Sequence, residues 1–181
     1  MSSPLVAPVT LASADPKAAA MLNAVKAKLG MIPNLYATLA HSPAALDAAL
    51  AISGALGAGR LTAAEREIVA LATAQVNGCQ YCLSAHTLLA KHAGLSSDDV
   101  VNARTGSGQT SRSAAIAALA KSITVERGHV NPEAIAAARA SGLTEADLME
   151  VVVGVAANVL TNFTNNLART AIDFPVVATE V

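Results

Sequence analysis

Apolar residues, alanine above all, recur along most of the chain, and short polar segments separate the runs. Alanine has the highest helix propensity, so these runs predict helices. Even the β-branched run at residues 151–153 falls inside a helical period, and no segment indicates a strand. The pattern therefore predicts an all-α fold, a compact helical bundle.

Capping residues mark the starts of the predicted helices. Three starts place a capping residue before a proline at the first helical position: Asp15-Pro16, Ser42-Pro43 and Asn131-Pro132. Three others are capping boxes, with an acid three residues after a hydroxyl: Thr62 and Glu65, Ser96 and Asp99, and Thr144 and Asp147. The predicted helices cover about residues 16–29, 44–56, 65–76, 80–93, 97–104, 112–127, 132–140 and 145–168, with a flexible loop at 105–111.

Length and composition suit a single domain with an apolar surface. We expect an irregular N-terminal arm over residues 1–14 and one helical domain over 15–181. Charged residues make up 14% of the chain, against about 25% in a typical soluble domain. An isolated chain would therefore expose much apolar area, and we expect copies of the chain to cover it in a homo-oligomer.

Charge and hydropathy exclude several partners. The net charge of −1, the absence of a basic run and the 2% aromatic content argue against nucleic-acid binding. The longest strongly apolar stretch, residues 151–157, is far shorter than the roughly 20 residues of a membrane span. Residues 1–15 have no signal-peptide pattern, so we expect a cytoplasmic protein.

The candidate chemistry lies in residues 65–94, which form a helix, an Asn77-Gly78 turn and a second helix. Cys79 and Cys82 stand at the start of the second helix, and His86 follows four residues later on the same face. The positive end of a helix stabilises a thiolate, and a C-x-x-C pair can close a disulfide. A histidine one turn further can exchange a proton near neutral pH.

Glu67 is the candidate partner of that histidine. If Gly78 is the corner of an antiparallel helix pair, His86 lies eight residues after it and Glu67 eleven before it. The mismatch of three residues is about 4.5 Å along a helix, which a glutamate side chain can span. The carboxylate could then orient the imidazole, as the acid does in catalytic triads. The alternative is an acid on the solvated first turn of a helix.

Other polar residues near the motif have less specific interpretations. A zinc site made by the two cysteines, His86 and His92 is disfavoured, because His92 lies off the shared helix face. Tyr81, next to Cys82, is interpreted as packing over the site, with donation to a peroxide or sulfenate oxygen as the alternative. Four asparagines share a helix face, and we favour helix-end solvation or a subunit contact over a place beside the thiols: Asn158, Asn162, Asn165 and Asn166.

The spacing of Glu67, Cys79, Cys82 and His86 resembles that of the alkylhydroperoxidase AhpD-like branch of the carboxymuconolactone decarboxylase family. The segments at 32–36, 40–43 and 158–175 are similar to its peroxidase-related members. The resemblance implies an AhpD-like helical fold that assembles into dimers, trimers or hexamers. The family's decarboxylases need no cysteine pair, and no arginine cluster near the motif is evident to hold a carboxylate.

The resemblance also implies roles for the site residues. Cys82 would be the peroxidatic thiol and Cys79 the resolving thiol, with Glu67 and His86 as the proton relay and no metal or other cofactor. Tyr81 stands where prototype members carry a histidine. The predicted function is thiol-dependent reduction of organic hydroperoxides by an external dithiol or thiol protein. The alternative is a thiol-disulfide exchange or redox-sensing module without significant peroxidase activity.

Overall fold

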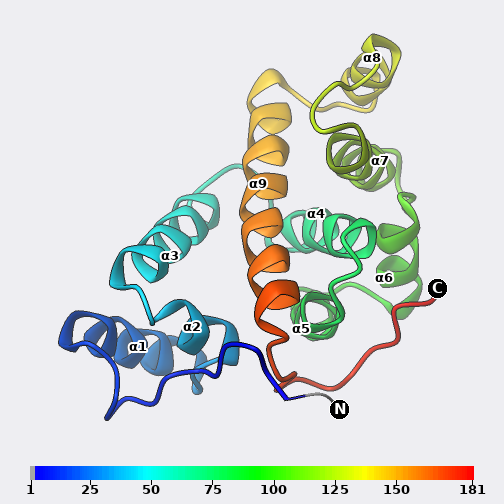
Figure 1. Cartoon of the computed structure of the whole chain (residues 1–181). Coiled ribbons are helices and arrows are strands. Elements are labelled where there is room, and N and C mark those ends of the chain that lie inside the picture. Colours follow the sequence, from blue (N-terminus) through cyan, green and yellow to red (C-terminus); the bar gives the residue numbers. More distant parts are fainter. Residues whose placement is uncertain (1–2) are drawn as a thin grey trace.

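The computed structural model describes residues 3–181, and over that range it contains helices, turns and irregular segments but no strand (Figure 1). The all-α prediction is therefore confirmed. The helices are α1 (Pro16–Leu29), α2 (Asn34–Leu39), α3 (Pro43–Gly57), α4 (Ala63–Val76), α5 (Gln80–His92), α6 (Ser97–Thr105), α7 (Ser111–Glu126), α8 (Pro132–Ala140) and α9 (Glu145–Ala168).

The helix bounds match the predictions closely except at α2. Helices α8 and α9 have the predicted bounds, and the three predicted capping boxes are present. Helix α2 was not predicted because it has only six residues and follows Pro33 without a side-chain cap. Residues 3–14 of the predicted arm contain no helix, and residues 1–2 lie outside the described residues. The predicted extent of the single domain stays a prediction.

Helix α4 is the centre of the fold. Every residue from Ile68 to Ala74 is buried, because α5, α6, α7 and α9 pack around the helix. A helix that is apolar on all sides is expected in such a central position. Gly154 lets α9 approach closely, since a Cβ there would lie 3.1 Å from Val69 Cγ1. The helix that carries Glu67 is thus fixed on every side.

Helix α9 stands between the helices α1–α3 and the helices α4–α7 (Figure 1). Contrary to expectation, it is long and apolar enough to cross a membrane by length and composition alone, with 33% of its most apolar window buried. In this fold it packs against α2, α3, α4, α5 and α7. These contacts are those of a core helix in a helical bundle, which is consistent with a soluble protein.

The chain after α9 returns across the molecule as a strap, residues 170–181, that ends beside α6 (Figure 1). The buried guanidinium of Arg104 donates to the carbonyls of Ala178, Thr179 and Glu180. The Val177 N–H donates to Ser84 Oγ at 3.0 Å. The Arg104 bonds hold the end of the strap on α6, and the Ser84 bond holds the strap on α5, the helix that begins at the two cysteines.

Candidate active site

The turn between α4 and α5 places the first cysteine at a helix start. Gly78 adopts a positive φ of 59°, which a glycine tolerates without strain, and the chain then enters α5. Cys79 is the N-cap of α5, and its Sγ accepts a hydrogen bond from the Cys82 N–H at 3.4 Å. The predicted C-x-x-C motif at a helix N-terminus is therefore confirmed.

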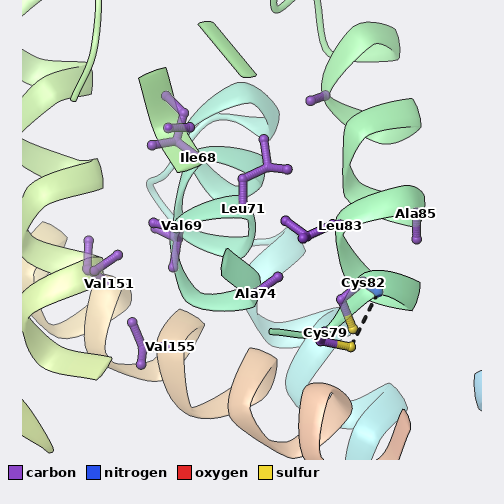
Figure 2. Close-up of a cluster of buried hydrophobic side chains, with 14 of the residues drawn as sticks. Ile68, Val69, Leu71, Ala74, Cys79, Cys82, Leu83, Ala85, Val151 and Val155 are labelled. Atoms are coloured by element: carbon purple, nitrogen blue, oxygen red, sulfur yellow. Dashed lines mark hydrogen bonds between the residues drawn. The ribbon is translucent and has the colours of Figure 1, made fainter. Parts of the chain in front are cut away.

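Both cysteines are free thiols inside the core, with 0% of Cys79 and 2% of Cys82 exposed. Their sulfur atoms lie side by side beneath Ala74 and Leu83 (Figure 2). A hydrogen bond from the Cys79 thiol lowers the pKa of Cys82 to about 6, and the nearby His86 adds to this effect against the opposing effect of burial. The same hydrogen bond, together with burial, raises the pKa of Cys79. Near neutral pH the proton therefore stays on Cys79, and Cys82 is the thiolate.

Asparagines of α9 contact the thiolate. The Asn165 Nδ2 donates to Cys82 Sγ at 3.3 Å, and Asn162 also lowers the pKa of Cys82. Asn162 accepts a hydrogen bond from Asn77 Nδ2 at 2.9 Å, which links α9 to the turn before Cys79. The interpretation favoured from sequence, helix-end solvation or a subunit contact, is wrong for Asn162 and Asn165, because both are buried against α5. The spacing of the four asparagines, at positions 158, 162, 165 and 166, indicates a shared face of the helix but does not show which helix that face contacts.

Glu67 and His86 meet across the α4–α5 pair. The His86 Nδ1 lies 2.7 Å from Glu67 Oε2, and the two side chains are 22% and 17% exposed. The structure thus brings together the acid and the imidazole at the position that the antiparallel corner predicts. Although burial opposes it, the Glu67 carboxylate raises the pKa of His86 above its usual value, with a smaller contribution from Cys82. With Nδ1 held by the acid, Nε2 is the ring nitrogen left for proton transfer.

A cavity of about 180 Å³, which we call the thiol cavity, opens beside these residues. Cys82, His86 and Glu67 line it, and Cys79 is fully buried outside it. Helices α3, α4, α5 and α9 supply mostly apolar walls, with Arg66 among the polar contributions. A small apolar molecule in this cavity can therefore contact one sulfur and one imidazole.

Arg66 was not foreseen from sequence as part of the site. Its Nη1 donates to the Leu61 carbonyl, so the guanidinium is held at the cavity wall next to Glu67. It adjoins Glu67 in the sequence, but an isolated arginine gives no signal that distinguishes a cavity wall from a solvated helix face. The site has this one arginine and not the cluster that would hold a carboxylate substrate.

Tyr81 packs over the site. Its hydroxyl accepts a hydrogen bond from the Leu35 N–H at 3.2 Å, and its ring meets Phe174 edge-on with the centroids 5.6 Å apart. Burial raises the pKa of this phenol, and the Asp173 carboxylate raises it further. The neutral phenol is therefore anchored on α2 and the strap, in agreement with the packing interpretation.

The described residues, 3–181, contain no group of three or more histidine, cysteine, aspartate or glutamate side chains placed to hold a metal ion. His92 is the last residue of α5, about three turns beyond Cys82. The geometry is that of an all-helical thiol protein: a buried cysteine pair beside an acid–histidine pair at a small cavity.

Comparisons with known proteins agree with that class. The carboxymuconolactone decarboxylase family model matches residues 43–125, which include all four predicted site residues. No curated protein matches the chain significantly. A solved structure, the alkylhydroperoxidase AhpD core of an uncharacterized peroxidase-related protein from Ralstonia eutropha JMP134, is 25% identical and has a TM-score of 0.85, with 96% of this chain and 94% of that chain covered.

Two further solved structures share the fold. A peroxidase-related protein from Silicibacter sp. TM1040 is 20% identical, with a TM-score of 0.75 over 98% of this chain and 96% of that chain. The debrominase Bmp8, as a cysteine-to-alanine variant in complex with 2,3,4-tribromopyrrole, is 18% identical, with a TM-score of 0.79 over 96% and 93%. The chain is therefore similar in sequence to the carboxymuconolactone decarboxylase family over residues 43–125, and similar in fold to the AhpD core over nearly its whole length. The matched family and structures are named for more than one reaction, which include decarboxylation, peroxide reduction and debromination.

Proposed function

We propose that this protein is a thiol-dependent peroxidase that reduces organic hydroperoxides with electrons from an external dithiol. The observation that carries the proposal is the position of Cys82. It is the thiol with the lowered pKa, and it lines the thiol cavity together with His86 and Glu67. A thiolate is the nucleophilic form of cysteine, so the reactive sulfur and the proton relay face the same substrate space.

In the first step the Cys82 thiolate attacks the terminal oxygen of the hydroperoxide. The S–O bond forms, the O–O bond breaks, and the alkoxide leaves. The alkoxide takes a proton from His86, whose other ring nitrogen is held by Glu67 at 2.7 Å. The products are an alcohol and a sulfenic acid on Cys82, so the sulfur has been oxidised by two electrons.

In the second step Cys79 resolves the sulfenic acid. Its thiol gives up a proton to the relay, and the sulfur attacks Cys82 Sγ, three residues further along the same helix start. The S–S bond forms, the S–O bond breaks, and water leaves. An external dithiol then reduces the disulfide, so each cycle converts a hydroperoxide and a dithiol into an alcohol, water and an oxidised dithiol. All electrons pass through sulfur, and the cycle uses no metal or bound cofactor.

This chemistry fits a reducing compartment such as the cytoplasm, where thiol reductants keep cysteines reduced.

We also propose that the chain works as a homo-oligomer. Large apolar side chains are exposed along α9, among them Met149, Phe163 and Leu167 at 59%, 58% and 70%. Copies of the chain would cover this surface. Sedimentation at micromolar concentration should give a dimer, trimer or hexamer, and a clean monomer would contradict this part of the proposal.

The test is turnover of cumene hydroperoxide with dithiothreitol by the wild type, Cys82→Ser and Cys79→Ser. The wild type should turn over, and both variants should lose turnover by at least about a thousandfold, as expected when a nucleophile or its partner is removed. Full activity in Cys82→Ser would refute the assignment. A wild type that forms a reversible disulfide with diamide but does not reduce peroxide would instead be a thiol-disulfide exchange or redox-sensing module.

The shared fold with the debrominase Bmp8 defines a second assay on the same proteins. A thiol pair can supply the two electrons that replace a carbon–bromine bond by a carbon–hydrogen bond, with release of bromide and formation of a disulfide. Bromide release from 2,3,4-tribromopyrrole should be slow compared with peroxide reduction. Faster bromide release would assign the thiol cavity to a halogenated ring instead.

A further inference from the structure

A second cavity lies behind the cysteine pair, at the point where α5 begins and α9 ends. It has a volume of about 400 Å³ and contains Gly78 and Gln80, the two neighbours of Cys79 in the sequence, together with Arg169 at the end of α9. We call it the Arg169 cavity. Among the described residues, Tyr81 is the one residue that lines both this cavity and the thiol cavity. Neither cysteine lines the Arg169 cavity, and Cys79 is fully buried, but the cavity borders the start of α5 on both sides of Cys79 in the sequence.

Two buried polar atoms of residues that line the Arg169 cavity lack a hydrogen-bond partner among the described residues. Asn165 Oδ1 and Thr170 Oγ1 have no hydrogen-bond partner within residues 3–181, although these residues are only 3% and 7% exposed. An unpaired buried polar atom costs about 1–3 kcal/mol. The other end of the same amide, Asn165 Nδ2, donates to Cys82 Sγ. Asn165 therefore links the lining of the Arg169 cavity directly to the Cys82 sulfur.

The direction of disulfide reduction requires an approach to Cys79. Thiol-disulfide exchange is faster when the departing sulfur is the more stable thiolate. Cys82 is that sulfur, because Asn165, His86 and the Cys79 thiol all stabilise its anion. A reductant that entered the thiol cavity would meet Cys82 first and would have to expel Cys79, the poorer leaving group. The productive attack is therefore on Cys79, from the side away from Cys82.

We propose that the Arg169 cavity is the entry site of the thiol reductant, and that it favours thiols that carry a carboxylate. The inference rests on the proposed peroxidase cycle, in which Cys79 and Cys82 form a disulfide. The reductant thiolate attacks Cys79 Sγ, the S–S bond breaks, and Cys82 leaves as a thiolate. A second thiol then releases the reductant as its own disulfide and returns Cys79 to the thiol.

The charge of the lining supports an anionic reductant. Arg169 is exposed at the mouth of the cavity, and the positive end of α5 faces the same space through Gly78 and Gln80. The nearest carboxylate along the strap, Asp173, accepts the Asn34 N–H at 2.8 Å and is not among the residues that line the cavity. A carboxylate on the reductant would therefore meet positive groups in the cavity.

The test separates the two half-reactions. The disulfide is first made with diamide, so that its reduction can be measured without any peroxide, and thiol alkylation followed by mass spectrometry counts the reduced molecules. Ala171→Trp and Asn166→Trp fill the Arg169 cavity from exposed positions, Ser53→Trp fills the thiol cavity, and Lys91→Trp is an exposed control on α5 that lines neither cavity. Circular dichroism verifies the fold of each variant.

Ala171→Trp and Asn166→Trp should slow reduction by dithiothreitol by about tenfold or more, a loss of about 1.4 kcal/mol, and leave oxidation by cumene hydroperoxide unchanged. Ser53→Trp should slow oxidation and leave reduction unchanged, and Lys91→Trp should change neither rate. Unchanged reduction in both cavity-filling variants, or slower reduction in Ser53→Trp alone, would overturn the proposal. Because oxidation is measured separately, a wild type that is reduced but never oxidised by peroxide contradicts only the proposed function.

The preference for a carboxylate is tested with Arg169→Asn. Arg169 has a left-handed backbone, φ 50°, which asparagine tolerates better than most residues. Reduction by dimercaptosuccinate should slow by about two- to fivefold, the worth of an exposed ion pair, and reduction by the neutral dithiothreitol should not change. An equal effect on both reagents would show that Arg169 does not select charge and would overturn this part of the proposal.

Discussion

Helix α9 ends in two different polar environments. Near its N-terminus, Asp147 and Glu150 are carboxylates that accept hydrogen bonds from the backbone of Thr144, Arg60 and Leu61. Near its C-terminus the buried polar residues that face α5 are neutral amides. Asn162 Nδ2 and Asn165 Oδ1 are buried there without a hydrogen-bond partner in the described residues 3–181. The carboxylates at the first end are paired, and the buried amides at the other end are neutral and incompletely paired.

The difference follows from what each end contacts. The charged end holds the loop before α4, where paired carboxylates contribute to stability. The neutral end contacts Cys82, and a carboxylate in that place would raise the pKa of the thiol by repelling the thiolate. An amide nitrogen stabilises the thiolate and adds no negative charge. The unpaired amide atoms cost stability, as expected at a site adapted to chemistry rather than to packing.

The largest expected effect at the reactive end comes from Glu67→Gln, which keeps the shape of the side chain and removes the charge that orients His86. The second-order rate of peroxide reduction should fall by about a hundredfold, the usual contribution of a positioned proton relay. Stopped-flow measurement of Cys82 oxidation gives that rate.

Glu65→Gln, two residues earlier on α4, is the matched control for that variant. Glu65 caps the helix through Thr62 and pairs with Arg112 at 2.6 Å. Its loss should lower the free energy of unfolding by about 1 kcal/mol and leave the oxidation rate unchanged. If the two variants lost equal activity, the specific role of Glu67 would be wrong.

Asn165→Asp places a carboxylate, the group found at the N-terminal end of α9, at its C-terminal end. A carboxylate next to Cys82 should raise the pKa of the thiol from about 6 by about one to three units, so that oxidation at pH 7 slows by about twofold to a hundredfold and recovers as the pH rises. Asn165→Ala removes the donor without adding charge and should have a smaller effect in the same direction. Equal rates in Asn165→Asp and wild type at pH 7 would show that the amide does not tune the thiolate.

Asp147→Asn tests the paired end. The Thr144 backbone N–H and two arginines hold the pKa of Asp147 at about 2, and its side chain is only 4% exposed. The variant should lose about 1–2 kcal/mol of unfolding free energy at pH 7 and keep its oxidation rate. Because the folded pKa is depressed, this stability is present above about pH 4 and is lost as the pH falls towards 2. Urea unfolding of both proteins across that range measures the difference, and a pH-independent difference would exclude the ionic contribution.

The smallest expected effect is the pH dependence of Cys82 alkylation, which is measured on the wild type alone. Since the pKa of Cys82 is about 6, its alkylation by iodoacetamide should be nearly independent of pH above 7 and should fall about tenfold per unit below pH 5. Peptide mass spectrometry assigns the modified residue. A midpoint near the ordinary thiol value would contradict the stabilised thiolate.

Much of the fold could be predicted because its signals are local. Capping boxes and proline starts depend on neighbouring residues, and they placed α8 and α9 at their observed bounds. Helix α2 was missed because only six residues form it, with neither a side-chain cap nor a long apolar run. Its place depends on α3 and α9, which pack against it.

The candidate site also divides into residues that a local sequence pattern predicts and residues that it does not. Cys79, Cys82 and His86 share one helix, and Glu67 lies across a single tight turn, so counting residues predicts that they meet. Asn165 and Arg104 act over 83 and about 75 residues of sequence separation, and no local pattern reveals such contacts. The Arg169 cavity is likewise formed by segments that only the packing of α9 and the strap brings to α5.

The most direct test of the account is to trap the sulfenic acid. Cys79→Ser is treated with one equivalent of cumene hydroperoxide in the presence of dimedone, and the modified peptide is identified by mass spectrometry. A single dimedone adduct is expected on Cys82, and it should form faster at pH 7 than at pH 5. Consumption of the peroxide without an adduct, or no reaction of Cys82 with the peroxide at all, would contradict the assignment of Cys82 as the thiol that attacks the peroxide.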